Sequence, residues 1–358
     1  MQIVKGAGQI AGEIRKILLI QLGDIGDVVL SFPCVVALQE RYPEAEVVVA
    51  VREKGAGLLA NCPGAGVLAV RGGESLAGQI RFIRHLRGHH FDLAIDLRTG
   101  TRGAIMARLS GAPIRLGYYD EDGHSWRNRL FTDLVDIPYT PDLHVIDHLL
   151  GLLEPYGITT SRRSPVMVLP DAVQAAASRL LAQANIPAGT SLMALQPFSL
   201  WRYKELAEGK YVELIKLLKS HYQLTVLVTG SAAEQERAAA IVAAAGEGCL
   251  NLAGQTSIDL YAALLAKCAL FIGVDSAGLH LAAAVGTPTV SIFGPSSPIS
   301  WAPRGAEHLL ARKAWPCLPC RMKGCEGREK SRCLDELEVA ELWEVVKKQL
   351  ANKVEARG

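Results

Sequence analysis

Short apolar runs alternate with longer amphipathic stretches along almost the whole chain. The apolar runs cover residues 16–21, 46–51, 67–70, 92–97 and 114–117 in the first half, and 192–196, 224–229, 268–274 and 289–293 in the second. Many are rich in β-branched residues and lack a polar face, which is typical of strands buried in a parallel sheet. Helix-length stretches such as 211–222 and 234–245 lie between them. The pattern therefore predicts doubly wound α/β sheets.

A break in this alternation divides the chain in two. Residues 159–172 hold two prolines and a charged cluster without clear periodicity, as interdomain linkers do. A chain of 358 residues is also long for one hydrophobic core. We therefore expect a first domain over residues 1–165, a second over residues 166–335, and a final helix within residues 336–358 that packs back on the first domain. Residues 1–16 are expected to be a loosely ordered extension or a short lead-in helix.

The overall composition is that of an ordinary globular protein. The chain is 49% hydrophobic and 21% charged with a formal net charge of +2, so its charge gives no reason to expect a nucleic-acid partner. No apolar run reaches the ~18 residues that a membrane span needs. The N-terminal residues lack the apolar core and cleavage site of a signal peptide. We therefore expect a cytoplasmic protein whose eight cysteines are thiols or metal ligands.

Positive charge is concentrated in one part of the first half. The arginines there are Arg81, Arg84, Arg87, Arg98, Arg102 and Arg108. This cluster fits either solvated helix faces or a site for an anionic partner.

The stretch "LLIQLGDIGDVVLSFP" has the strand, glycine turn and helix of a phosphate-binding loop. Two carboxylates, Asp24 and Asp27, occupy the turn where a phosphate would approach. Asp27 is either a cap for the following helix or a residue with chemistry of its own.

The second half holds a denser set of polar residues at predicted strand ends. In "CALFIGVDSAGLHLAAAVGTPTVSIFGPSSP", Asp275 and Ser276 follow a buried strand, and Ser276 is placed to cap the next helix. Ser199 and Lys204 follow the strand 192–196, and Glu234 follows the strand 224–229. A capped helix, a structural histidine and a glutamate at a helix dipole would explain each feature separately. Because parallel strands end at one edge, the features together favour a nucleotide pocket.

Four further cysteines lie in "WPCLPCRMKGCEGREKSRC", at Cys317, Cys320, Cys325 and Cys333. The first pair has zinc-ligand spacing, but the second pair is spread more widely than in common zinc fingers. Free thiols that order a loop are favoured over a zinc site, so no metal is expected.

The pair "GDIGDVVLSFPCVVALQERYP" and "GVDSAGLHLAAAVGTPTVSIFGPSSP" resembles glycosyltransferase family 9, the ADP-heptose:lipopolysaccharide heptosyltransferases. The stretches "WRYK", "VTGSAAEQER" and "NLAGQTSIDLYAALL" fall between them in the expected order. "HVIDHLLGLLEPYGI", "GVDSAGLH" and "ISWAPRG" are most similar to the heptosyltransferase III branch. The resemblance implies a GT-B fold, in which two Rossmann-like, doubly wound domains face one another across a cleft.

The resemblance also implies roles for individual residues. Asp27 matches the general base, Lys204 the lysine near the donor phosphates, and Glu234 the acid that binds the ribose. The donor-binding residues that it implies are Ser199, Lys204, Glu234, Asp275, Ser276, Ala277, Gly278 and His280. The acceptor-binding residues that it implies are Gly26, Arg98 and Arg102. One departure concerns Ser199, which stands where some members carry paired threonines, so donor identity is the property in question.

The implied reaction is inverting transfer of heptose from ADP-L-glycero-β-D-manno-heptose to the lipopolysaccharide inner core, without a metal or other cofactor. The acceptor is an anionic lipid, so peripheral contact with the cytoplasmic face of the inner membrane is expected. Two alternatives stay open at this point. One is a GT-B enzyme with another nucleotide sugar or glycan acceptor, and the other is a non-catalytic two-domain protein that binds a sugar or nucleotide.

Overall fold

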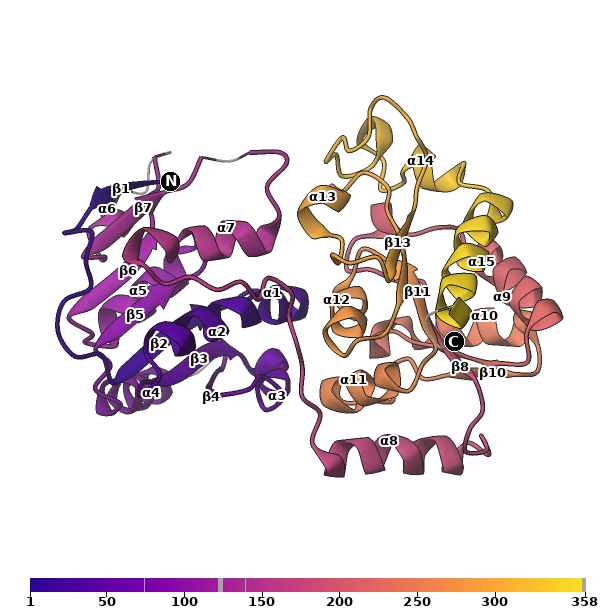
Figure 1. The fold of residues 1–358 in the computed structure, drawn as a ribbon, viewed down its shortest axis with the longest axis horizontal. Coiled ribbons are helices and arrows are strands. Elements are labelled where there is room, and N and C mark those ends of the chain that lie inside the picture. Colours follow the sequence, from indigo (N-terminus) through magenta and orange to yellow (C-terminus); the bar gives the residue numbers. More distant parts are fainter. Residues whose placement is uncertain (74, 122–124, 139, 356–358) are drawn as a thin grey trace. The chain divides into compact units, whose positions relative to one another are not determined.

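The chain forms two compact units, Met1–Met167 and Val168–Gly358, in a computed structural model that describes residues 1–73, 75–121, 125–138 and 140–355. The division falls within the stretch 159–172. Each unit has a largely parallel sheet with helices on both faces, as Figure 1 shows, so the predicted α/β class is confirmed.

The first unit is built on a seven-stranded sheet, with strands Gln2–Lys5 (β1), Lys16–Gln21 (β2), Glu46–Arg52 (β3), Ala65–Val70 (β4), Leu93–Asp96 (β5), Ile114–Tyr118 (β6) and Asp133–Asp136 (β7). Their order is β1-β7-β6-β5-β2-β3-β4. From β4 to β7 all neighbours are parallel, and β1 is antiparallel to β7. Without β1, this is the strand order of the dinucleotide-binding fold.

Helices cover both faces of this first sheet. They are Ile25–Leu30 (α1), Phe32–Arg41 (α2), Ala56–Leu59 (α3), Leu76–Gly88 (α4), Thr101–Leu109 (α5), Ser125–Asn128 (α6) and Val145–Gly151 (α7). Helix α2 packs against α7, and α4 packs against α5. Because crossovers between parallel strands are right-handed and the chain reverses direction after β4, α2 and α3 cover one face while α4 and α5 cover the other.

The second unit has a six-stranded parallel sheet, with strands Leu192–Gln196 (β8), Thr225–Val228 (β9), Cys249–Asn251 (β10), Leu270–Val274 (β11), Thr289–Ile292 (β12) and His308–Ala311 (β13). The order is β10-β9-β8-β11-β12-β13, again that of the dinucleotide-binding fold. The helices are Asp171–Gln183 (α8), Glu208–His221 (α9), Gln235–Ala245 (α10), Ile258–Ala266 (α11), Ala277–Ala284 (α12), Pro298–Trp301 (α13), Arg332–Asp335 (α14) and Val339–Glu355 (α15).

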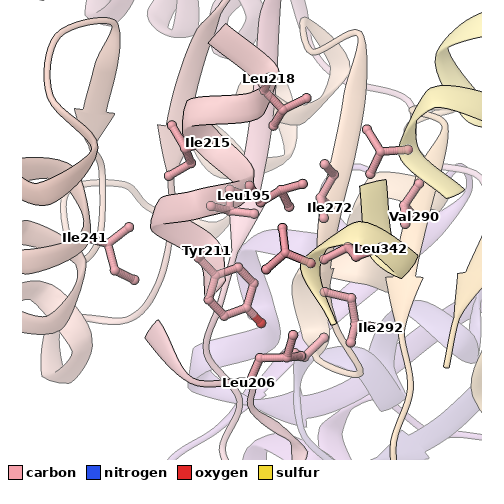
Figure 2. Close-up of a cluster of buried hydrophobic side chains, with 14 of the residues drawn as sticks. Leu195, Leu206, Tyr211, Ile215, Leu218, Ile241, Ile272, Val290, Ile292 and Leu342 are labelled. Carbon is pink, nitrogen blue, oxygen red and sulfur yellow. The ribbon is translucent and has the colours of Figure 1, made fainter. Parts of the chain in front are cut away.

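The main core of the second unit lies between its sheet and helices α9, α10 and α15 (Figure 2). Helix α9 contributes a stripe at helical spacing, with Tyr211, Ile215 and Leu218 all buried. These side chains pack against Leu195 of β8 and Ile272 of β11, which are completely buried. This packing fixes the strand ends that carry the polar residues described below.

The C-terminal helix α15 belongs to the second unit. It packs against α9, β12 and β13, and it buries Leu342 and Val346 in the core of that unit. The expectation that this part of the chain packs back on the first unit remains a prediction. Among the described residues, α15 included, we find no helix with the length and apolar character of a membrane span.

The N-terminal extension differs from its prediction as a loose segment or short helix. Residues Gln2–Lys5 form the strand β1, and Lys5 donates a hydrogen bond to the backbone oxygen of Phe131. Ile14 and Ile17 are buried in the unit. The short strand was not foreseen because its residues are mostly exposed, so they carry no two-residue alternation to mark it.

Both sheets have the same topological switch point, where the strand order reverses. In the first unit it lies between β2 and β5, and in the second between β8 and β11. Ligands of open α/β sheets bind beyond the carboxyl ends of the strands at this point. The loops after β2, β5, β8 and β11 are therefore the first place to look for a site.

Candidate active site

Asp27 lies in the first turn of α1, the helix that follows β2. It is the third residue of that helix, and Asp24 occupies the N-cap position, so Asp27 is not the N-cap residue itself but closes a capping box with Asp24. The Oδ2 atom of Asp27 accepts a hydrogen bond from the backbone N–H of Asp24 at 2.9 Å and one from Nη1 of Arg98 at 2.7 Å. The two donors hold this carboxylate in one orientation, with part of it open to solvent.

Gly23 leaves the space that this pair occupies, and it is not needed for an unusual backbone conformation. A Cβ atom at Gly23 would lie 2.4 Å from Oδ2 of Asp27 and 2.7 Å from Nη1 of Arg98. The Gly23 φ angle is not in the left-handed region that favours glycine. Glycine is therefore required here for space, and a larger residue would displace the carboxylate or the guanidinium.

A buried ion pair, Asp96 with Arg127, holds the backbone of Arg98 in place. Arg127 is completely buried, and its Nη2 donates to the backbone oxygen of Arg98 at 2.8 Å and to Oδ2 of Asp96 at 3.5 Å. The other carboxylate oxygen of Asp96 accepts the backbone N–H of Arg98 at 3.2 Å. The guanidinium of Arg127 also lies 4.9 Å from the centre of the Phe131 ring. Asp96 and Arg127 thus fix the backbone from which Arg98 reaches Asp27.

The pKa of Asp96 makes the stability of this unit depend on pH. Burial raises the pKa of its carboxyl group from the usual 3.8 to about 7, and the attraction of Arg127 offsets only part of that shift. Between those values the folded chain keeps a proton that the unfolded chain has released. This group's contribution to stability therefore falls as the pH rises through the window, by at most ~1.4 kcal/mol per pH unit.

Asp96→Asn should abolish this component of the pH dependence. As the pH rises from about 4 to about 7, the melting temperature of the variant should fall by less than that of wild type. Thermal unfolding monitored by circular dichroism across that range measures the difference. The same slope in both proteins would contradict the raised pKa.

In the second unit, the loops after β8 and β11 meet at one ion pair. Lys204, in the short helix Arg202–Lys204 (η3), has its Nζ atom 2.6 Å from Oδ2 of Asp275. Both side chains are mostly buried. The hydroxyl of Ser199 donates to the backbone oxygen of Asp275 at 3.3 Å. The structure thus brings together three of the residues that the sequence predicted for the donor site.

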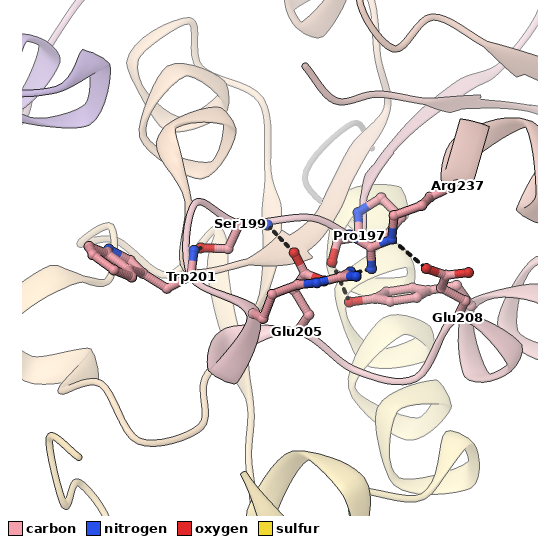
Figure 3. Close-up of polar contacts among 8 residues, drawn as sticks. Pro197, Ser199, Trp201, Glu205, Glu208 and Arg237 are labelled. Carbon is pink, nitrogen blue, oxygen red and sulfur yellow. Dashed lines mark hydrogen bonds and ion pairs between the residues drawn. The ribbon is translucent and has the colours of Figure 1, made fainter. Parts of the chain in front are cut away.

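A second network of polar contacts, shown in Figure 3, stabilises the loop that follows β8. Glu205 accepts the backbone N–H of Ser199 at 2.9 Å and forms an ion pair with Nη2 of Arg237 at 2.7 Å. Arg237 also pairs with Glu208 at 2.6 Å and lies over the ring of Phe198. This network could not be predicted from the sequence, because only the fold brings α10 beside the loop that follows β8.

Ser276 occupies the N-cap position of α12, but its side chain makes no capping hydrogen bond. Its Oγ atom is buried and has no hydrogen-bond partner among the described residues, and the same is true of Ser296 in the loop after β12. Gly278 lies against Oε1 of Gln196, which a Cβ atom would approach to 2.0 Å. Buried hydroxyls without partners at a strand end are candidates for binding a ligand oxygen. His280 is itself buried, one turn into α12.

The remaining predicted site residues lie at the same carboxyl edges. Ala277 is the first residue of α12 and Gly26 lies in α1. Arg102 donates to the backbone oxygen of Arg71 at 3.2 Å, linking the first turn of α5 to the loop after β4. Glu234 accepts the backbone N–H of Ser231 at 2.6 Å, so its carboxylate stabilises a helix start. A role for Glu234 with a ribose stays a prediction.

The four clustered cysteines range from the exposed Cys317 to the buried Cys333. Within the four described ranges, no group of three or more His, Cys, Asp or Glu residues is arranged to hold a metal ion. Burial and the neighbouring thiols of Cys325, Cys320 and Cys317 raise the pKa of Cys333 to about 11. The preference for free thiols over a zinc site stays a prediction.

Comparison with known proteins places this geometry in a family. Residues 79–330 match the family described as Glycosyltransferase family 9 (heptosyltransferase). "Lipopolysaccharide heptosyltransferase 3" of Escherichia coli is 28% identical over 291 residues, covering 78% of this chain and 83% of the relative. That relative agrees with the heptosyltransferase III resemblance.

Solved structures agree on the fold. "Structure of E. coli ADP-heptose lps heptosyltransferase II" aligns with a TM-score of 0.79 at 22% identity, covering 94% of this chain and 99% of that one. "E. coli heptosyltransferase WaaC with ADP-2-deoxy-2-fluoro heptose" aligns with a TM-score of 0.70 at 18% identity, covering 93% and 99%. With two units of dinucleotide-binding topology, the fold is GT-B. The chain is therefore a glycosyltransferase and belongs to glycosyltransferase family 9.

Proposed function

We propose that this enzyme transfers heptose from ADP-L-glycero-β-D-manno-heptose to the lipopolysaccharide inner core. Membership of the heptosyltransferase family supports the sugar, and the E. coli relative's name supports the lipopolysaccharide acceptor. One neighbouring structure is described as holding an ADP-linked fluoroheptose, which supports the donor. We place the enzyme in the cytoplasm, at the inner face of the inner membrane where such an acceptor is built.

The single observation that carries the mechanism is the fixed carboxylate of Asp27 at the switch point of the first unit. A sugar hydroxyl has a pKa far above 7, so it needs a base within hydrogen-bond reach as it attacks. Bond formation to the oxocarbenium-like anomeric carbon raises the acidity of that hydroxyl, and a carboxylate then suffices. Asp27 takes the proton in this step, while Gly26, Arg98 and Arg102 bind the acceptor. Attack opposite the leaving ADP inverts the anomeric configuration.

The second unit supplies the stabilisation of the leaving group. Charge develops on the β-phosphate as the sugar leaves, and Lys204 provides a cation for it. The backbone N–H groups of Ala277 and Gly278 start α12, whose dipole also favours an anion. The unpartnered hydroxyl of Ser276 adds a donor at that helix start. These groups take the place of a divalent ion, so the proposed transfer is metal-independent.

Product analysis tests this reaction type directly. The proposal predicts an α-linked heptose product in proton NMR spectra, the inverse of the β-configured donor. It also predicts an undiminished rate in the presence of EDTA. Retained configuration would refute the direct displacement with Asp27 as base, and complete loss of rate with EDTA would refute metal independence.

Lys204→Gln is expected to raise KM for ADP-heptose by roughly 10- to 100-fold, because a hydrogen bond to a charged group contributes about 1.5–3 kcal/mol. Steady-state kinetics with varied donor concentration measures the change. Lys216→Gln is the matched control, because Lys216 is an exposed lysine on α9. An equal KM in the two variants would remove Lys204 from the donor site.

A further inference from the structure

Helix α4 has one buried face and one outward face of unusual composition. Phe82 and Leu86 pack into the core of the first unit, which fixes the orientation of the helix. On the opposite side, Leu76 is 73% exposed and Ile80 is 44% exposed. Residues 76, 80, 84 and 87 follow one another at helical spacing, so these two apolar side chains share a stripe with Arg84 and Arg87. The exposed Arg81 directly follows Ile80 and borders this stripe.

Helix α5 repeats this composition beside α4. Ile105 is 43% exposed and lies between the exposed Arg102 and Arg108, three residues away on either side. Nε of Arg87 donates to the backbone oxygen of Leu109 at 3.2 Å, which joins the two helices. Both helices therefore contribute to one surface on the same side of the sheet.

The charge of this surface is of one sign. Helices α4 and α5 contain five arginines, at 81, 84, 87, 102 and 108, and no acidic residue. In the part of the chain that the structure describes, Arg81, Arg84 and Arg108 form no ion pair. The whole chain has a formal charge of only +2, so the positive charge here is a local concentration.

We propose that this face, formed by Leu76, Ile80, Arg81, Arg84 and Ile105, is a docking surface for an anionic lipid membrane. Arginines alone would fit any anion, but exposed aliphatic side chains between them fit a surface with both anionic headgroups and apolar chains. Single exposed apolar residues are ordinary, but here three of them lie beside unneutralised arginines on two adjacent helices.

The location of the face fits a lipid-linked acceptor, and this part of the inference rests on the proposed function. Leu76 begins the helix after β4, and Arg102 lies in the first turn after β5. Both are at the carboxyl edge of the sheet that also carries Asp27 and Arg98. A membrane bound along α4 would present a lipid-anchored sugar to that edge.

Vesicle flotation of the full-length protein tests the docking surface without catalysis. Wild type should bind vesicles of equal parts phosphatidylcholine and phosphatidylglycerol and should not bind phosphatidylcholine alone. Arg81→Gln with Arg84→Gln should weaken binding about 25-fold, since each arginine near an anionic surface contributes ~1 kcal/mol. Leu76→Ser with Ile80→Ser should weaken it at least about fivefold.

Matched controls carry the same changes elsewhere. Arg179→Gln with Lys216→Gln removes two exposed charges from the second unit, and Val166→Ser with Val168→Ser removes two exposed apolar side chains. Both should bind as wild type does. The proposal would be overturned if wild type did not bind the anionic vesicles. It would also be overturned if control and test variants, all with unchanged melting temperature, lost binding equally.

A transfer assay separates this proposal from the proposed function. The arginine variant should lose rate on acceptor embedded in anionic vesicles and keep the wild-type rate on a delipidated acceptor. Loss on both acceptors with intact vesicle binding would mean that the arginines contact the acceptor's own anionic groups, which overturns the docking surface. If wild type transfers to neither acceptor, the proposed function fails while the flotation result still decides the membrane question.

Discussion

Asp27→Asn is expected to lower the rate of heptose transfer by roughly two to four orders of magnitude, the usual contribution of a general base. Asparagine preserves the shape of the side chain and can still accept the backbone N–H of Asp24. It cannot take the proton from the acceptor hydroxyl. The melting temperature and the affinity for ADP-heptose should therefore stay near wild type, because the donor is proposed to bind the second unit. Steady-state kinetics and calorimetric titration with donor measure the two effects.

Asp24→Asn is the matched control for this prediction. Asp24 lies three residues earlier, its side chain is 68% exposed, and asparagine serves equally well at a helix N-cap. Its rate should stay within a few-fold of wild type. Equal rates for Asp27→Asn and wild type would refute the general-base role.

Arg127→Met is expected to lower the free energy of unfolding by about 3–5 kcal/mol at a pH above the raised pKa of Asp96. Removing one partner of a buried ion pair leaves the other charge buried without compensation. Arg127 also donates to the backbone oxygens of Tyr118 and Arg98, and these acceptors would lose their partner. Urea unfolding monitored by fluorescence measures the loss.

Two further variants show where that loss comes from. Arg129→Met replaces an exposed arginine two residues away and should change stability by less than about 0.5 kcal/mol. Adding Asp96→Leu to Arg127→Met should restore part of the lost stability, because it removes the uncompensated carboxylate. A double variant less stable than the Arg127→Met single variant would contradict this explanation.

The strands of both sheets could largely be predicted from the sequence, and the reasons are physical. Strands such as β2 and β8 are buried on both faces, so their apolar runs match their observed bounds. The missed strands β1, β7, β10 and β13 are short. Strand β7 begins and ends with aspartate, and β10 is only partly buried, so neither presents a continuous apolar run.

The candidate site was predictable where it depends on chain order and not where it depends on tertiary contacts. Asp27, Lys204 and Asp275 lie in the segments that follow β2, β8 and β11, so topology alone places them near carboxyl edges. Arg127 could not be found this way. It is 31 residues from Asp96 along the chain, and an arginine in a polar stretch predicts an exposed side chain. Only the fold of the first unit buries it.

Transfer to a panel of truncated lipopolysaccharide cores tests whether ADP-heptose and a lipopolysaccharide core are the substrates of this enzyme. Purified enzyme is incubated with ADP-heptose and each core, and the products are analysed by mass spectrometry. The proposed function predicts that at least one core gains the mass of a single heptose unit, and that ADP is released in equal amount. No heptose-bearing product with any core, together with transfer from a different nucleotide sugar, would contradict it.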